Sequence, residues 1–300
     1  MLDKIISFFM GLLTAVMMMF YTPSAVPPIN PDPIPEAAKT QQLTIMSYNV
    51  YVAGSGERSP ENRTPLVVQK IRTYMPDSFG LQEVDEGWIE RLTAEFADEY
   101  AYVGEHRGSL SNDEASPVFY LKTKYELLDS GTFWLSPTPE KSSRGWDAMI
   151  KRICSYAVLK DKETGFVYAH FNAHFDHMGV IARNESVRVI ATKISEIAPD
   201  IPVVVTGDFN DKEGTDMYNR VLESGLKDTK YAATVSDSGA TYHGYGGDNP
   251  DGLPIDFIFT NGYVQSVASY KVDREKLDKI FASDHHPVIS ELTLFNGEEK

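Results

Sequence analysis

The 300-residue chain has a single cysteine, Cys154, so it cannot form an intrachain disulfide. This cysteine lies in an apolar run, which predicts a buried and inert thiol rather than a nucleophile. Basic residues are also few: 28 Lys and Arg face 43 Asp and Glu, and the formal net charge is −15. A chain of this charge repels polyanions and lacks the basic surface of a tight duplex-DNA binder. A metal ion can still compensate acidic groups within one site.

No internal repeat of fixed period is present, which excludes a solenoid. The composition is otherwise that of a globular protein, with 42% hydrophobic and 24% charged residues. Aromatic and β-branched residues are too frequent for a disordered chain. The length beyond the N-terminal region suits one large α/β domain better than two small ones.

The N-terminus carries an almost continuous apolar run at residues 5–21, preceded by Lys4. Such a run predicts export or anchoring, and residues 1–25 are read as a signal peptide or an N-terminal membrane anchor. A buried N-terminal helix is the alternative, although no polar face interrupts the run. The proline-rich residues 26–42 predict an extended linker, and the catalytic domain is expected at 43–295. We therefore expect an extracytoplasmic protein, secreted or anchored to the membrane.

Short β-rich runs alternate with helical periods after residue 43. The expected strands are 43–50, a short strand ending at Leu81, 116–121, 154–159, 167–174, 202–206, 255–259, 264–270 and 288–294. A helix is expected at 65–75, where Pro76 stops it, and a second helix has Val187, Ile190, Ile194 and Ile197 on one face. The polar turn at 160–165 predicts an antiparallel hairpin. Many strands with interspersed helices indicate layered sheets.

Polar residues that could bind a metal or take part in catalysis lie where the apolar strands end. They are Asn49 in SYNV, Glu83 in LQEV, His174 and Asp176 in HFDH, Asp208 and Asn210 in GDFN, and Asp284 and His285 in SDHHP. Carboxylates from separate strands make an oxygen-rich pocket for a hard cation such as Mg²⁺, and histidines can move protons near neutral pH.

The ordered series SYNV, LQEV, SPVFY, NAHFDH, GDFN, IDFIF and SDHHP resembles the endonuclease/exonuclease/phosphatase superfamily between residues 43 and 294. Within it, HFDHMGVIAR is similar to bacterial members in which this motif enters an arginine-bearing helix, and it resembles the deadenylase-like branch. The resemblance implies an α/β (α+β) fold, the DNase I-like four-layer sandwich, in which two mixed β-sheets pack face to face and are flanked by helices.

The same resemblance implies a role for each motif residue. Glu83 matches the principal metal ligand, supported by Asn49, and Asp284 matches a carboxylate that completes or neighbours the site for Mg²⁺ or Mn²⁺. Asp208 and Asn210 match the pair that orients the nucleophilic water and the phosphoryl group.

His285 matches the general base, and Asp256 of IDFIF matches the carboxylate that orients its ring. His174 matches the second active-site histidine, which stabilises phosphoryl charge or protonates the leaving group. Because adjacent residues of an extended segment face opposite ways, His286 is read as structural.

Substrate contacts are expected from Tyr120, Arg152, Asp176, His177 and His243. Each has a plainer alternative. Asp176 and His177 could form a local hydrogen-bonded turn, Tyr120 and Arg152 could support the core edge, and the glycine-rich loop around His243 could be a surface loop. A surface or core-edge position is favoured for Arg183.

The motif residues also have plainer readings when taken singly. Asn49 could cap a turn, Glu83 could favour a following helix N-terminus, and Asp208 could be a turn residue beside Gly207. Asp256 is harder to explain in this way, because a carboxylate within a core strand is costly without a buried partner.

These residues predict a divalent-metal-dependent phosphoesterase that uses in-line attack of water. The first-choice substrate is a phosphodiester of the kind that nucleases cleave, so nucleic acid stays among the candidate partners. The alternative is a lipid or inositol phosphate, which membrane association through the N-terminus would suit. A noncatalytic binding module on the same fold is the alternative from another class, disfavoured because every motif residue is present. The sequence indicates no protein partner.

Overall fold

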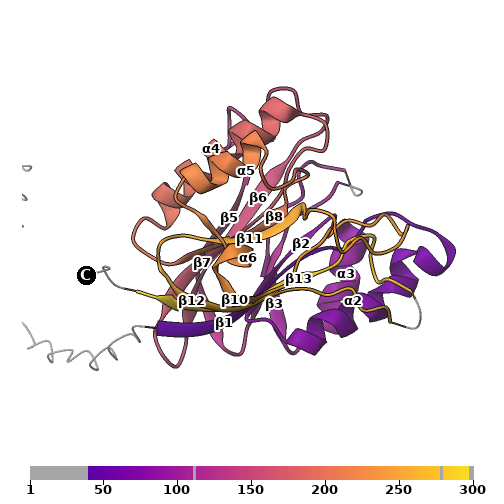
Figure 1. The fold of residues 1–300 in the computed structure, drawn as a ribbon, viewed down its shortest axis with the longest axis horizontal. Helices are drawn as coiled ribbons and strands as arrows, with labels where there is room; N and C mark the ends of the chain where they lie inside the picture. Colours follow the sequence, from indigo (N-terminus) through magenta and orange to yellow (C-terminus); the bar gives the residue numbers. More distant parts are fainter. Residues whose placement is uncertain (1–39, 111–112, 278–279, 297–300) are drawn as a thin grey trace, which may run out of the picture. The chain divides into compact units, whose positions relative to one another are not determined.

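The computed structural model describes residues 40–110, 113–277 and 280–296. In this part of the chain two mixed β-sheets pack face to face, and helices cover the outer face of each (Figure 1). The expected four-layer sandwich is confirmed. The regions predicted as signal or anchor and as linker lie outside the described residues, except for 40–42. Those three residues open the first strand, slightly ahead of the expected domain start at Leu43.

The first sheet has seven strands in the order β10-β12-β13-β1-β2-β4-β3. Its strands are β1 (Thr40–Asn49), β2 (Ser78–Gln82), β3 (Tyr100–Val103), β4 (Val118–Leu121), β10 (Ala233–Ser236), β12 (Val264–Val272) and β13 (Val288–Phe295). Strand β1 pairs parallel with β2 and antiparallel with β13. Strand β1 is buried from Ile45 to Asn49, which suits its central position in the sheet, and its exposed residues lie at the outer end near Thr40.

The second sheet has six strands in the order β5-β6-β7-β8-β11-β9. Its strands are β5 (Tyr125–Trp134), β6 (Ile153–Asp161), β7 (Val167–His174), β8 (Val203–Asp208), β9 (Lys227–Asp228) and β11 (Asp256–Thr260). Strands β6 and β7 form the expected antiparallel hairpin, whereas β7 and β8 are parallel. The crossover between them is the long helix α4 (Val180–Ile197).

Helices α2 (Pro60–Tyr74) and α3 (Glu86–Glu95) cover the first sheet, and α4 (Val180–Ile197) and α5 (Asp216–Glu223) cover the second (Figure 1). The one-turn segments η1 (Gly56–Arg58) and α6 (Thr229–Ala232) lie in connections. Helix α2 begins before the expected 65–75, because Ser59 caps it and Pro60 suits its first turn. Its end at Met75, next to Pro76, is as expected.

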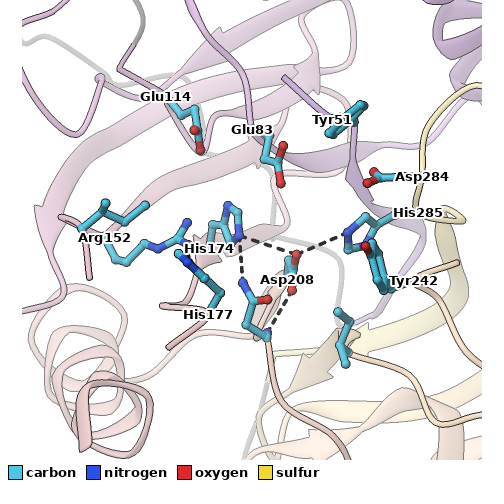
Figure 2. A pocket seen from close by; sticks show the side chains of 13 residues that line it. Tyr51, Glu83, Glu114, Arg152, His174, His177, Asp208, Tyr242, Asp284 and His285 are labelled. Carbon is cyan, nitrogen blue, oxygen red and sulfur yellow. Dashed lines mark hydrogen bonds and ion pairs between the residues drawn. The ribbon is translucent and has the colours of Figure 1, made fainter. Parts of the chain in front are cut away.

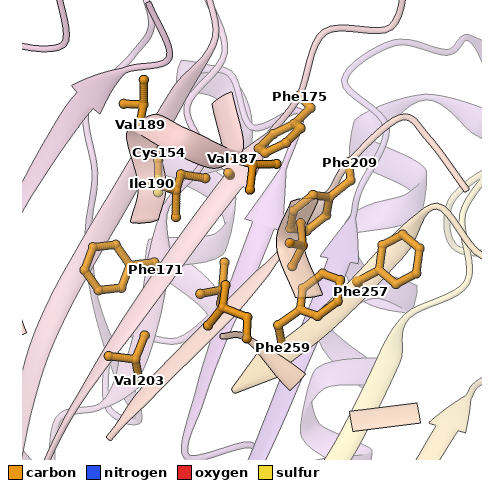
Figure 3. Close-up of a cluster of buried hydrophobic side chains, with 14 of the residues drawn as sticks. Cys154, Phe171, Phe175, Val187, Val189, Ile190, Val203, Phe209, Phe257 and Phe259 are labelled. Carbon is orange, nitrogen blue, oxygen red and sulfur yellow. The ribbon is translucent and has the colours of Figure 1, made fainter. Parts of the chain in front are cut away.

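Three apolar clusters hold the four layers together. One lies between the second sheet and its helices, where Phe171, Phe209 and Phe257 pack near Val187 (Figure 3). A second joins the first sheet to α2 and α3, and a third fills part of the space between the sheets. Cys154 is fully buried in the first cluster, as the sequence predicts, and desolvation raises the pKa of its thiol. Apolar side chains lie on both faces of each sheet because successive residues of a strand point to opposite faces.

Strand direction brings the polar strand ends to one edge. The parallel pairs β1–β2 and β7–β8 end there, which brings Asn49 beside Gln82 and His174 beside Asp208. Strands β11 and β13 run the other way and begin at the same edge, so Asp256 lies opposite Asp208. Sequence-distant polar residues therefore meet at one end of the sandwich.

Several elements were not expected from the sequence. The largest is β5, a ten-residue strand whose side chains are mostly exposed or half exposed, and these side chains and Gly131 give it little apolar pattern. Helix α5 and the short strands β3, β9 and β10 were also missed. Among the described residues no helix is long and apolar enough to span a membrane.

Candidate active site

A pocket of about 340 Å³ opens at the edge where the strands β1, β2, β7 and β8 end (Figure 2). It brings together most of the residues to which the resemblance assigns chemistry. Those that line it are Glu83, His174, Asp208, Asn210, Asp284 and His285. Two of the expected substrate-contacting residues, Arg152 and His177, line it as well.

One side of the pocket is a line of three groups, Asp256, His285 and Asp208. His285 Nδ1 lies 2.9 Å from Asp256 Oδ2, and its Nε2 lies 3.7 Å from Asp208 Oδ2. Burial of the imidazole favours its neutral form, but the charge and hydrogen bond of Asp256 outweigh this and raise the pKa of His285 to about 10. Asp256 therefore orients the ring and stabilises its protonated form, and its buried carboxylate has the partner that a core strand requires.

His174 and Asn210 contact Asp208 from the other side. Asn210 Nδ2 lies 3.0 Å from His174 Nε2 and donates to Phe175 O at 3.0 Å, while the Asn210 backbone N–H donates to Asp208 Oδ1 at 2.9 Å. His174 Nε2 lies 3.6 Å from Asp208 Oδ2. Burial, with the nearby positive charge of Arg152, holds the pKa of His174 well below its ordinary value. This imidazole is consequently neutral.

Asn49 connects the two sheets at the pocket floor. Its Nδ2 donates to Glu83 Oε1 at 3.1 Å and to Asp208 Oδ2 at 3.0 Å. Its Oδ1 accepts the Tyr51 N–H at 3.0 Å, which fixes the orientation of the amide, and Val52 N–H donates to Glu83 Oε2 at 3.0 Å. In this arrangement Asn49 positions carboxylates that come from different sheets.

Among the motif residues of the pocket, two have backbone in the left-handed region that favours glycine, as does the neighbouring Tyr51 with φ 57°. Glu83 has φ 60° and Asn210 has φ 50°. Glu83 directly follows the end of β2, and Asn210 is the second residue after the end of β8. In each case the chain turns at the edge of the sheet where the pocket lies. Asn adopts this conformation fairly readily, whereas Glu does so at a cost.

The carboxylates of the pocket fit a divalent cation. Glu83, Asp208 and Asp284 offer the hard oxygen ligands that Mg²⁺ and Mn²⁺ take. Burial, with the charge of Asp256, raises the pKa of Asp208 to about 7, and burial together with the neighbouring charge of Glu83 raises the pKa of Asp284. A cation would relieve this repulsion.

A second grouping has metal-like spacing, since ligand atoms of Asp208, Asp256 and His285 lie within 4.8 Å of one another. We assign it to the proton relay instead, because His285 Nδ1 is already bonded to Asp256 Oδ2. The oxygen ligands around Glu83 are then the better cation site.

The loops that frame the pocket are held by Arg63, a fully buried residue of α2. Its Nε donates to Arg58 O at 2.7 Å, its Nη1 to Val50 O and to Ala282 O at 3.1 Å, and its Nη2 to Tyr51 O and to Ala53 O at 2.9 Å. All five N–H donors of the guanidinium are therefore bonded to backbone carbonyls. They join the loop after Asn49 to the segment that precedes Asp284.

Three of the residues expected to contact substrate do not line the pocket. Tyr120 packs in the apolar cluster between the sheets, because its position on β4 faces inward. His243 stacks on the buried His286 at 4.3 Å between ring centroids and does not line the pocket. Asp176 accepts backbone N–H groups from Met178 and Gly179, which is the local turn of its alternative reading.

Arg183 lies at the edge of the core, which agrees with its favoured alternative. It is buried, and it donates to Asp176 O at 3.0 Å and to Asp211 Oδ2 at 3.1 Å. The HFDH turn and the segment after GDFN are thereby joined.

Five pocket residues were missed by reading the sequence: Tyr51, Glu114, Ile150, Tyr242 and Ile255. Tyr51 and Ile255 each lie within two residues of a motif residue, so proximity could have suggested them. Glu114 and Tyr242 belong to polar loops without a strand-end signal. The Tyr242 ring contacts that of His285 at 4.9 Å between centroids and stays half exposed.

The fold and the pocket are those of the DNase I-like hydrolases that act on phosphate ester bonds. The chain belongs to the Endonuclease/Exonuclease/phosphatase family, whose model matches residues 46–285.

Solved structures with substantial sequence identity agree with this assignment. An endonuclease/exonuclease/phosphatase from Bacteroides vulgatus is 34% identical, with a TM-score of 0.80 over 85% of this chain and 99% of that chain. A mannosyl-6-phosphatase from Bacteroides thetaiotaomicron is 30% identical, with a TM-score of 0.78 over 83% of this chain and 99% of that chain. Among curated proteins, the CCR4-Not complex 3'-5'-exoribonuclease subunit Ccr4 of Aspergillus niger is 22% identical over 85% of this chain. The chain spans only 52% of that relative's length.

Proposed function

We propose that the protein is a divalent-metal-dependent phosphoesterase that hydrolyses the phosphate ester of a sugar or similar polyol, with Mg²⁺ or Mn²⁺ as the cation. The observation that carries the hydrolase assignment is the hydrogen-bonded Asp256–His285 pair, which faces Asp208 in the same pocket as Glu83 and Asp284.

Glu83, Asp208 and Asp284 would hold the cation, with Asn49 fixing the first two. When bound, the cation supplies charge stabilisation and polarises the phosphoryl group.

The other groups of the pocket orient the water and the phosphoryl group and transfer a proton. Asp208 and Asn210 orient the attacking water. A bound cation would offset the charges of Asp208 and Asp284 that help to raise the pKa of His285, so that the neutral imidazole can accept the water proton at Nε2 while Asp256 stabilises the imidazolium that forms. His174 is neutral, and its Nε2 accepts the Asn210 Nδ2–H, which fixes the imidazole and the Asn210 amide beside the phosphoryl group. Water is the nucleophile, so no covalent enzyme intermediate forms.

Two observations favour a small sugar phosphate over a nucleic acid. The net charge of −15 opposes the approach of a polyanion, and the pocket of about 340 Å³ has the size of a small-ligand site. The solved mannosyl-6-phosphatase adds support through its identity and almost complete coverage. The resemblance to an exoribonuclease subunit keeps nuclease activity as the second candidate.

The test is hydrolysis by the purified full chain with Mg²⁺ or Mn²⁺ and with EDTA. The substrates are mannose 6-phosphate, glucose 6-phosphate, p-nitrophenyl phosphate, bis-p-nitrophenyl phosphate, RNA, DNA, sphingomyelin and inositol phosphates. We expect EDTA-sensitive release of phosphate from a sugar phosphate. Faster cleavage of RNA or DNA would favour the second candidate, and a lipid or inositol substrate would restore that alternative. No metal-dependent turnover of any substrate would favour a binding module.

We also propose an extracytoplasmic location, supported by the apolar run at 5–21. Cell fractionation should find the protein in the membrane or in a soluble form that begins after about residue 25. A cytosolic protein with an intact N-terminus would contradict the proposal.

A further inference from the structure

One side of the pocket is lined by residues to which the proposed hydrolysis assigns no role. Figure 2 shows Arg152 and His177 on one side of His174 and Asp208, with Glu114 above them, while His285 and Tyr242 lie on the other side. Arg152, His177 and Glu114 line the pocket, and the proposed hydrolysis uses none of these three residues. A carboxylate and a guanidinium thus face the same small space.

Glu114 is held firmly. Its two carboxylate oxygens accept hydrogen bonds from Arg107 Nη1 and Nη2, each at 2.8 Å, and its backbone oxygen accepts the Arg107 N–H at 2.9 Å. The next residue, Ala115, pairs with Val84, which directly follows Glu83. Glu114 is therefore fixed relative to the cation site, and its remaining lone pairs can accept hydrogen bonds from a ligand.

Arg152 is held less completely. The residue is 5% exposed, its Nη2 lies 3.2 Å from His177 Nδ1, and its Nε lies 3.7 Å from Asp176 Oδ2. The buried Nε has no hydrogen-bond partner among the described residues. A buried guanidinium with unused donors at a pocket wall is costly unless a ligand completes its hydrogen bonds.

The pairing of charges indicates the chemistry of that ligand. Arg152 alone could bind a second phosphate, but Glu114 would repel it at close range. Hydroxyl groups suit both partners, because each hydroxyl can donate to the carboxylate and accept from the guanidinium. A nucleic acid would bring a neighbouring phosphate to this wall, whereas a sugar would bring hydroxyls.

We propose that Glu114 and Arg152 form a hydroxyl-binding subsite, which holds the sugar of the substrate and selects sugar phosphates over esters that lack hydroxyls. Arg107 positions Glu114, and His177 positions Arg152. The inference rests on the proposed function and adds to it the residues that determine specificity.

The experiment compares kcat/KM for mannose 6-phosphate with kcat/KM for p-nitrophenyl phosphate, which has no sugar hydroxyl. The full-length variants are Glu114→Gln, Glu114→Ala and Arg152→Lys. Glu105→Gln is the matched control, because Glu105 is exposed on the same segment and does not line the pocket. Thermal unfolding of each variant checks that it is folded.

We expect Glu114→Ala and Arg152→Lys to lower kcat/KM for the sugar phosphate by about 10- to 100-fold, mainly through KM, as loss of a hydrogen bond to a charged group does. The loss with p-nitrophenyl phosphate should be several times smaller, so the ratio of the two constants changes. Glu114→Gln should lie between wild type and Glu114→Ala, and the control should keep the wild-type ratio.

Two outcomes would overturn the inference, and they differ from each other. Equal losses on both substrates in folded variants would show that the wall supports the fold or the chemistry rather than sugar binding. If the wild type hydrolyses p-nitrophenyl phosphate or a nucleic acid but no sugar phosphate, the proposed function fails first and the subsite fails with it.

Discussion

Replacing Arg63 by lysine should destabilise the protein far more than its conservative chemistry suggests. The five N–H donors of this buried guanidinium bond five backbone carbonyls, and a lysine ammonium has three donors at a single point. At least two of the five carbonyls, which are buried or partly buried, lose this partner. At about 1–3 kcal/mol for each unsatisfied group, the free energy of unfolding should fall by about 2–6 kcal/mol.

The assay is urea denaturation of wild type and Arg63→Lys, followed by both circular dichroism and intrinsic fluorescence. Arg72→Lys is the matched control, because Arg72 lies on the same helix with its side chain 41% exposed. It should change stability by no more than about 0.5 kcal/mol. Hydrogen exchange should also speed up in residues 50–58, which the Arg63 contacts hold. If Arg63→Lys is as stable as the control, the bonds to these carbonyls do not hold the loops.

The remaining predictions concern the catalytic groups and one buried histidine. Asp256→Asn should lower kcat by about 10²- to 10⁴-fold with little change in KM, because His285 loses the carboxylate that stabilises its protonated form; steady-state kinetics retaining most of the wild-type kcat would refute the relay. Glu83→Gln should weaken Mg²⁺ binding in calorimetry by roughly tenfold or more, whereas the exposed Glu90→Gln should leave it unchanged. Burial lowers the pKa of His170 to about 3, so between about pH 6.5 and pH 3 the unfolded state binds a proton that the folded state does not. Stability should therefore fall with decreasing pH in that window, by up to about 1.4 kcal/mol per unit from this group, and His170→Gln should show a shallower fall in denaturation series; identical slopes would contradict the assignment.

The strands that carry the motifs could be predicted because their apolar runs end in polar residues. Strand 167–174 has the bounds that the sequence gives, and the strand through Asp256 starts within one residue of its expected position. Strand β5 could not be found in this way, because it is an edge strand with side chains that are mostly exposed or half exposed. Its place is fixed by pairing with β6, which is a long-range contact.

The candidate site divides in the same way. The residues at strand ends were predicted, because the motifs are local and the direction of the strands brings them to one edge. Glu114 and Arg63 were not, since their roles depend on contacts with distant segments. Tyr120 illustrates the reverse case, in which a residue within a motif belongs to the core between the sheets.

The left-handed backbone at Glu83 and Asn210 shows where local preference gives way to the site. A glycine would adopt these angles without strain, but it would remove the carboxylate or the amide that the pocket needs. At Glu83 the strain is offset by neighbours: Val84 pairs with Ala115 through two backbone hydrogen bonds, and the Glu83 carboxylate accepts the Val52 N–H. Because Ala115 directly follows Glu114, the contacts that hold the strained residue Glu83 also fix Glu114, which is proposed to bind the sugar. A change that loosened the Val84–Ala115 pairing should therefore impair metal binding and sugar selectivity together.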